Sequence, residues 1–366
     1  MAYTTINNGS LFMNPILYTG NAGTQSITNL GFQPDLTWIK SRSAATYHSL
    51  SDSASGTDIQ LGVNDANAAD AFTTAITAFD SDGFSLGSNG NTNASAATFV
   101  GWNWKGGTTS GIATNGSTTI TPSAYSFNQT SGVSILKFTG NEVSGAKLAH
   151  GLGKKPAMII CKSHLSGAWG VYNESLGATY AMILNTAAAQ DLDSSAWNDT
   201  EPDSVNITLG SSINTNKIGD MVCYAFANIE GFSQCGSYKG NGNIDGPFLN
   251  VGFKPSFLIF KNATTLGEEW KILDTTRDPI NRATDKVLIA DQAVAENDAS
   301  NALTDFLSNG FKIRSTHAAI NQSNSTFIYM AFADAPLVGT NDVPACARQF
   351  MLFGFDSFAT QPFAAT

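Results

Sequence analysis

Three stretches of the chain carry an apolar side chain at every second position. They lie at residues 100–104, 222–226 and 328–332, and each follows a shorter stretch with similar alternation, at residues 83–86, 206–209 and 310–313. A period of two is typical of a β-strand with one buried face. The pattern therefore predicts a pair of half-buried strands in each third of the chain.

The same three regions also open alike. A Gly-Asn dipeptide follows an apolar strand in each region, at Gly20-Asn21, Gly140-Asn141 and Gly240-Asn241. A later strand begins near Pro34, Pro156 or Pro255 and ends at Lys40, Lys162 or Lys261, and the prolines are separated by the same two gaps as the lysines. Several features that recur in one order indicate internal repeats. We predict three copies of one unit.

Turn-forming residues separate the predicted strands. Clusters of Gly and Asn at residues 87–91 and 240–243 supply the backbone conformations that hairpins need. Short strands at this spacing favour sandwiches or barrels. Ala-rich segments at residues 65–78, 186–196 and 292–307 allow short helices. The predicted fold class is mainly β, with three tandem β-sandwich-like repeat units and short helical insertions.

The unit boundaries follow from these landmarks. We expect repeat units at residues 1–106, 122–230 and 231–338. Residues 107–121 are rich in Gly, Ser and Thr, and this composition predicts a flexible linker between the first two units.

Residues 339–366 form an apolar C-terminal arm beyond the third unit. Four of its phenylalanines are candidate subunit-docking residues: Phe350, Phe353, Phe355 and Phe358. So much unpaired apolar surface would favour aggregation. The arm therefore either closes the fold of its own chain as a last strand or docks on a neighbouring subunit.

Composition and charge narrow the possible functions. Charged residues make up only 13% of the chain, so Ser, Thr, Asn and Gly must supply the polar surface. A net charge of −10 disfavours nucleic-acid binding. No apolar stretch is long enough for membrane insertion, and the first ten residues do not resemble a signal peptide. The four cysteines show no CxxC spacing, which fits synthesis in a reducing cytoplasm.

Motifs that could carry catalysis have simpler interpretations. Residues 83–87 match the GxSxG pattern around Ser85, but the other copies place Thr208 and Lys312 there and no helical pattern follows. Asp80 and Asp82 suggest a calcium loop that lacks its further ligands. The histidines are dispersed, without metal-site spacing. We predict no catalytic residue, no cofactor and no metal.

Carboxylates and aromatic rings leave two hypotheses about glycans. Glu268-Glu269 and Asp274 with Asp278 could supply the acid and nucleophile of a glycosidase, but the sequence does not give their separation. Most tryptophans align with apolar positions of the other copies and belong to the core. Trp197 is flanked by small polar residues, so it is the candidate exposed contact for a glycan or receptor.

Several of these motifs together resemble a family of repeat-containing proteins from the particles of tailed bacteriophages, especially marine ones. The resemblance covers roughly residues 3–338 and rests on motifs in order: Tyr18-Thr19-Gly20-Asn21, Gly31-Phe32-Gln33-Pro34, Trp102-Asn103-Trp104-Lys105, His150-Gly151-Leu152-Gly153 and Gly252-Phe253-Lys254-Pro255. The first seven residues are also similar to the start of those proteins, which suggests a complete polypeptide. The segment after Pro336 departs from the pattern.

The resemblance implies a surface component of the phage particle. We expect a structural protein without enzymatic activity, made in the bacterial cytoplasm and located on the virion surface. The specific expectation is a tail-fibre or receptor-binding component that contacts other virion proteins and a host surface glycan, assembled as a homotrimer. The alternatives are a capsid decoration or head-fibre protein and, third, a polysaccharide depolymerase.

Overall fold

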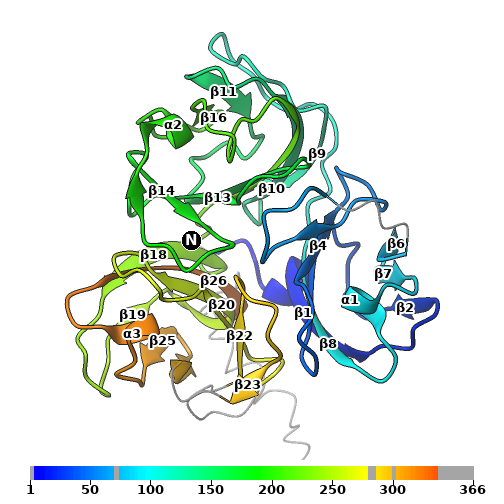
Figure 1. The fold of residues 1–366 in the computed structure, drawn as a ribbon, viewed down its shortest axis with the longest axis vertical. Helices are drawn as coiled ribbons and strands as arrows, with labels where there is room; N and C mark the ends of the chain where they lie inside the picture. The colour runs from blue at the N-terminus through cyan, green and yellow to red at the C-terminus, as the bar shows by residue number, and fades with distance from the viewer. Residues whose placement is uncertain (1–3, 70–73, 279–285, 299–301, 337–366) are drawn as a thin grey trace, which may run out of the picture.

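A computed structural model describes residues 4–69, 74–278, 286–298 and 302–336. These residues form three lobes around a common centre (Figure 1). We refer to residues 13–104 as the first lobe, 124–226 as the second and 233–336 as the third. The architecture is mainly β, as the alternating pattern predicted, and all pairings between named strands are antiparallel. No helix in the described residues is long and apolar enough to span a membrane.

Each lobe contains one large sheet, and the three sheets share one strand order. In the first lobe the order is β1 (Met13–Thr19), β8 (Thr98–Trp104), β3 (Leu36–Ser41), β4 (Ser49–Asp52) and β5 (Leu61–Gly62). In the second it is β9 (Ala124–Asn128), β10 (Val133–Gly140), β17 (Gly219–Phe226), β12 (Met158–Ser163), β13 (Gly170–Asn173), β14 (Tyr180–Ile183) and β15 (Asp191–Leu192). In the third it is β18 (Ser233–Lys239), β26 (Thr326–Pro336), β20 (Phe253–Asn262), β21 (Lys271–Asp274), β22 (Lys286–Ile289) and β23 (Asn297–Asp298). The extra strand β9 aside, the first strand of each lobe (β1, β10 or β18, the opening strand) pairs with the closing strand (β8, β17 or β26). The closing strand in turn pairs with the strand that carries Lys40, Lys162 or Lys261 near its end (β3, β12 or β20).

A smaller sheet accompanies each large one. The small sheets consist of β2 (Gln25–Ile27), β7 (Gly83–Leu86) and β6 (Ile76–Asp80); β11 (Ala146–Ala149) and β16 (Asn206–Leu209); and β19 (Phe248–Asn250), β25 (Gly310–Ile313) and β24 (Thr304–Leu307). In the first lobe Phe84 of β7 packs in one cluster with Ile39 and Phe99 of the large sheet. In the third, the ring of Phe311 meets that of Tyr329 edge-on at 5.2 Å. The lobes are thus two-layered and sandwich-like.

The closing strands are buried on both faces, which corrects the prediction of half-buried strands. In β17, Met221 and Cys223 pack toward the small sheet, whereas Tyr224 and Phe226 face the centre of the molecule. The period-two pattern reflects bulkier residues on the central face. Both faces are buried because the small sheet covers one and the other two lobes cover the other.

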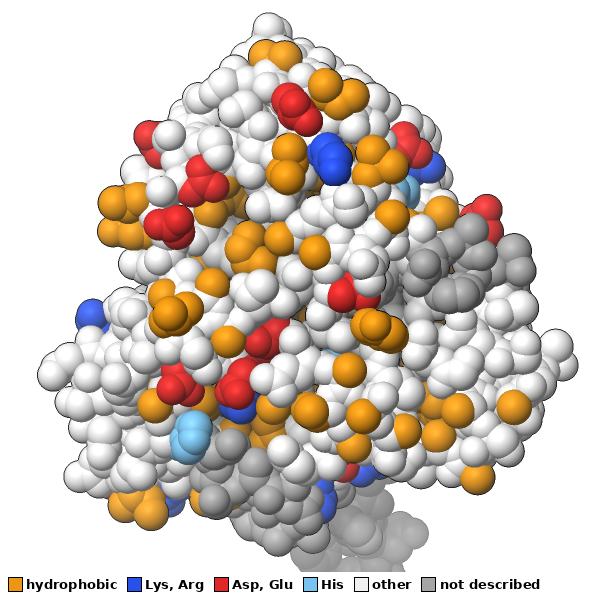
Figure 2. Space-filling model, viewed as in Figure 1, with side chains coloured by type: hydrophobic (Ala, Val, Ile, Leu, Met, Phe, Trp, Pro, Cys, Tyr) orange, Lys and Arg blue, Asp and Glu red, His pale blue; other side chains and the backbone are white. Residues whose placement is uncertain are grey.

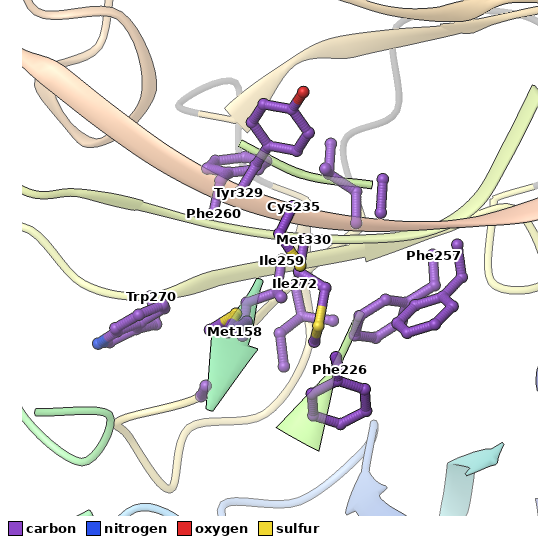
Figure 3. Close-up of a cluster of buried hydrophobic side chains, with 14 of the residues drawn as sticks. Met158, Phe226, Cys235, Phe257, Ile259, Phe260, Trp270, Ile272, Tyr329 and Met330 are labelled. Atoms are coloured by element: carbon purple, nitrogen blue, oxygen red, sulfur yellow. The ribbon is translucent and has the colours of Figure 1, made fainter. Parts of the chain in front are cut away.

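A single core joins the lobes. Trp104, Phe226 and Phe332, one from each closing strand, form mutual ring contacts at centroid distances of 5.8 to 6.2 Å. Figure 3 shows Phe226 and Met158 of the second lobe facing Phe257, Ile259 and Met330 of the third. The three inner sheet faces therefore bury one another within one chain.

The Gly-Asn dipeptides owe their positions to buried asparagines. Asn216 Oδ1 accepts from the backbone N–H of Asn141 at 3.0 Å, and its Nδ2 donates to Asn141 Oδ1 and to the carbonyls of Val143 and Gly210. Asn93 and Asn321 make the corresponding bonds in the other lobes. We call these three side chains the asparagine clamps.

The glycine of each dipeptide is required by close packing. A Cβ atom at Gly20, Gly140 or Gly240 would lie 2.1 to 2.2 Å from a backbone carbonyl oxygen of the segment that carries the clamp. No side chain fits at that distance, so glycine is needed for space rather than for an unusual backbone angle.

The helical expectation holds only in part. The described helices are the one-turn segments η1 (Gly9–Leu11), α1 (Gly90–Asn93), α2 (Ser194–Trp197) and α3 (Ala318–Asn321). Of the Ala-rich segments, 186–196 contains the start of α2, but the described parts of 65–78 and 292–307 contain no α-helix. Those segments instead run as extended loops and short strands against neighbouring lobes.

Residues 107–121 also differ from the expected flexible linker. Thr108 forms a β-bridge with Phe127, and Ile120 forms a parallel bridge with Leu148. Thr118 and Asn115 bind the side chain of Asn206. The segment is held against the outer side of the second lobe because its hydroxyl and amide groups form hydrogen bonds with residues of the β11–β16 sheet.

Candidate functional site

Trp197, the predicted glycan contact, is buried. Its side chain is 1% exposed and its ring meets that of Tyr172 edge-on at 5.9 Å. The flanking polar residues have a local role, since Asp193 caps α2 by accepting from the N–H of Ser195. The helix turns Trp197 into the core of the second lobe, so the prediction of an exposed ring is wrong. Phe350, Phe353, Phe355 and Phe358 lie outside the described residues.

Asp274, the candidate glycosidase carboxylate, is part of a buried ion-pair network. Its Oδ2 accepts from Trp102 Nε1 at 2.9 Å and from Arg277 Nε at 2.5 Å, and all three residues are at most 5% exposed. Glu269 is paired with Lys271 at 3.0 Å. Both carboxylates have structural partners, and Asp274 has no path to a sugar in this arrangement.

The remaining motif residues are also held in structural contacts. Ser85 Oγ donates to Asp80 Oδ2 at 2.7 Å within a strand paired on both sides. Asp82 accepts from the backbone of Asn29 and Gly31, as a turn residue does. Among the described residues no group of three His, Cys, Asp or Glu side chains could hold a metal ion.

The junctions between lobes follow a cyclic pattern. Trp169 Nε1 of the second lobe donates to the carbonyl of Gly62 in the first at 2.9 Å, and Trp270 Nε1 of the third donates to Ile183 in the second at 3.0 Å. His48 of the first lobe closes the cycle by contacting the carbonyl of Ile289 in the third at 2.9 Å. In each lobe the donor is the residue just before the equivalent strand, β4 (Ser49–Asp52), β13 (Gly170–Asn173) or β21 (Lys271–Asp274), and the acceptor lies in a different lobe.

His48 acts here as a neutral ring. Its Nδ1 lies 3.0 Å from Trp38 Nε1, which can only donate, so Nδ1 accepts and Nε2–H donates to Ile289. Burial lowers the pKa of His48 well below its ordinary value, and the nearby Lys40 adds to this effect. The imidazole N–H therefore donates to the neighbouring lobe as the indole N–H groups of Trp169 and Trp270 do.

A second set of contacts is complete at two junctions and incomplete at the third. Tyr224 of the second lobe donates to Asp52 of the first at 2.7 Å, as Trp102 of the first does to Asp274 of the third. The corresponding residues at the remaining junction are Met330 and Asn173. Methionine has no donor, and Asn173 Nδ2 is buried without a hydrogen-bond partner.

Three buried lysines lie at the ends of the inner strands. Lys40, Lys162 and Lys261 are each fully buried, and each donates to the backbone carbonyl of the next residue at 2.8 to 3.0 Å. Lys162 also reaches across to the carbonyl of Asn67 in the first lobe. Desolvation by burial lowers the pKa of each of the three to about 8. Lys162 thus joins loops of two lobes, whereas Lys40 and Lys261 hold the turns that follow their own strands.

The surface of the described residues carries small apolar groups and an open hollow. Figure 2 shows one face with small groups of hydrophobic side chains among mostly neutral atoms and few charges. An apolar cavity of ≈ 20 Å³ lies among Trp38, Trp104, Trp169 and Tyr224, which is room for about one water molecule. An open hollow of ≈ 450 Å³ is lined by polar residues such as Asn228, Glu230 and Gln234, without an aromatic ring.

The loops that follow the buried lysines carry exposed apolar side chains. Tyr47, Leu165 and Leu266 are 46%, 49% and 77% exposed, one from each lobe. We call these three residues the junction-loop triad. Sequence reasoning missed Tyr47, although its place just before His48, in a loop of small and polar residues, was the available signal. Within the described part of the chain, the exposed aromatic side chains are Tyr47 at 46% and Phe248 at 43%.

The chain belongs to a family whose description is "Domain of unknown function (DUF7483)", since the family model matches residues 8–336. No curated protein and no solved structure matches it. The family match spans all three lobes.

Proposed function

We propose that the chain is a non-enzymatic surface component of a tailed-phage particle, specifically a tail-fibre or receptor-binding protein. The observation that carries the proposal is the use of chemistry-bearing side chains as structural links. Asp274, His48 and Lys162 bond to groups of a neighbouring lobe, and Lys40 and Lys261 bond to backbone carbonyls of their own lobe, which leaves neutral loops outward. The sequence resemblance supplies the particle context.

The proposal includes an architecture of three copies of one β-sandwich-like unit. Its support is the shared strand order, the three asparagine clamps and the cyclic junction contacts. We place the copies at residues 1–106, 122–230 and 231–338. Such a scaffold presents three sets of similar loops in a fixed arrangement and suits display.

The contact surface that we propose is the junction-loop triad. Tyr47 replaces Trp197 as the candidate ring on which a host glycan stacks, because its side chain is 46% exposed and Trp197 is buried. Three equivalent loops on one body would add avidity to weak individual contacts.

The proposed homotrimer needs a surface other than the inner sheet faces. Those faces already bury one another within one chain. We therefore assign trimer contacts to outer surfaces and to the apolar arm at residues 339–366.

A capsid decoration or head-fibre protein is the second candidate. The observation that favours it is the arrangement of three lobes about one centre (Figure 1), which could match a threefold position on a capsid. A polysaccharide depolymerase is the third; of its candidate carboxylates, Asp274 is buried in an ion-pair network and Glu269 is paired with Lys271.

Binding experiments separate these candidates. The purified chain is incubated with host cells, with host envelope polysaccharide and with purified empty heads. We expect binding to cells and polysaccharide, weakened about 2- to 10-fold by Tyr47→Ala and unchanged by the neighbouring Thr46→Ala. Binding to empty heads alone would favour the decoration protein, and release of sugar from the polysaccharide would favour the depolymerase.

A further inference from the structure

Cys161 and Cys223 face each other across the two central strands of the second lobe. They are direct partners in the antiparallel pairing of β12 with β17. Both side chains belong to the core between the large and small sheets, and both residues are 0% exposed. The two thiols are close enough for Cys161 to contribute to the raised pKa of Cys223.

The register shows that Cys161 and Cys223 are the type of cross-strand pair whose Cα atoms lie closer together. His164 N donates to Asp220 O at 2.8 Å in the same register, and hydrogen-bonded pairs recur at every second residue of an antiparallel ladder. Cys161 and Cys223 therefore form a non-hydrogen-bonded pair, whose Cα atoms are typically ~4.5 Å apart. That separation falls within the ~4.4 to 6.8 Å that a disulfide spans.

The other two lobes have no thiols at this place. The corresponding pairs are Ile39 with Gly101 and Phe260 with Tyr329. A cysteine pair is thus not needed to pack a two-layer lobe, since three different combinations fill the same position. The second lobe alone carries a pair that can be cross-linked.

We propose that Cys161 and Cys223 are a redox modification site that forms a cross-strand disulfide once the protein leaves a reducing compartment. One thiolate attacks a disulfide oxidant such as oxidised glutathione and releases one reduced glutathione. The second thiol then attacks the mixed disulfide and releases the second glutathione. Two protein thiols are oxidised to a disulfide, and one glutathione disulfide is reduced to two thiols. With dissolved oxygen the two electrons and two protons go to hydrogen peroxide.

Burial sets the conditions for this reaction. Burial, with Cys161 alongside, raises the pKa of the Cys223 thiol, so the attacking thiolate is scarce in the folded protein. Oxidation is therefore fastest while the lobe folds or opens. Once formed, the buried bond is equally shielded from reductants.

The bond would join the lysine-bearing strand to the closing strand. It encloses β13, β14, β15, α2 and β16 in one covalent loop, which restricts the unfolded chain. We expect the melting temperature to rise by about 5 °C on oxidation.

The test uses the full chain in two arms. In one, the reduced native protein is held in oxygen-saturated buffer; in the other, the chain is refolded from denaturant in glutathione redox buffer. Free thiols are then alkylated under denaturing conditions and the peptides are mapped by mass spectrometry. We expect a linked peptide pair containing Cys161 and Cys223, with Cys235 alkylated, and the rise in melting temperature.

Matched variants separate the pair from other thiol chemistry. Cys161→Ala and Cys223→Ala should lose the linked peptide and the temperature shift on oxidation, whereas Cys235→Ala should keep both. Recovery of Cys161 and Cys223 as free thiols in both arms would overturn the proposal, as would a linkage of either one to a different cysteine. The test is independent of the proposed particle function.

Discussion

At the scale of single residues, several buried ionisable side chains form hydrogen bonds to the backbone of the folded protein. Lys40, Lys162 and Lys261 remain buried because backbone carbonyls accept from their ammonium groups. Asp291 is likewise buried and hydrogen-bonded to the backbone: its Oδ1 accepts from the N–H of Trp270. At the equivalent positions of the other lobes, Asn185 accepts from Trp169 N and Asn64 accepts from His48 N. Burial raises the pKa of Asp291 to about 6, in keeping with a position that suits a neutral amide.

The lysines predict a dependence of stability on pH. Their pKa is about 8 in the folded protein and near 10.5 when unfolded, so between these values the unfolded chain holds more protons. The lysines should therefore contribute a rise in the free energy of unfolding as pH increases from 8 toward 10, whereas Cys223 and Cys235, whose pKa burial raises, contribute in the opposite sense. Urea titrations isolate the lysine contribution: the stability of the native chain relative to Lys162→Met should rise over this range, and its stability relative to Lys154→Met, which is exposed, should stay constant. A constant or falling difference between the native chain and Lys162→Met would contradict the assignment.

At the scale of elements, the asparagine clamps explain why three turns share a Gly-Asn dipeptide. Replacing Asn216 by Ala removes four hydrogen bonds and leaves the carbonyl of Gly210 without its side-chain donor, while the carbonyl of Val143 keeps only the N–H of Ala146. We expect a loss of about 2 to 4 kcal/mol in the free energy of unfolding.

Chemical denaturation measures this loss. Ser211→Ala, at an exposed position near the clamp, serves as the control and should change stability by less than about 0.5 kcal/mol. If both substitutions had the same small effect, the clamp would not be what holds the turn.

Strands were predictable from the sequence because alternation and the recurring lysines are local signals. Inter-lobe contacts were not, because they depend on which strand ends meet after folding. Trp197 illustrates the difference: its neighbours are small and polar, yet a one-turn helix directs the ring inward. Residues 107–121 illustrate it too, since their composition predicts flexibility but their hydroxyls and amides bind the second lobe.

At the scale of the whole molecule, the lobes depend on one another. The inner face of the second lobe carries Trp169, Tyr224 and Phe226, which pack against the other two lobes. The two-layered lobe has its own second core on the other face. Its inner face would be exposed if the lobe were alone.

An isolated second lobe should therefore fail to fold cooperatively. A fragment of residues 122–230 should bind a hydrophobic dye and show no sharp thermal transition, unlike the full chain. Calorimetry and dye binding measure this. A soluble fragment with its own cooperative transition would show that the junctions are incidental to stability.

The central claim is that this three-lobed body is a surface component of a phage particle. Cryo-electron microscopy of intact particles tests it most directly, with an antibody to the chain as a label. We predict a three-lobed density on the exterior, at a tail fibre, that the antibody decorates. Purified particles that contain no such density and no detectable chain would contradict the account.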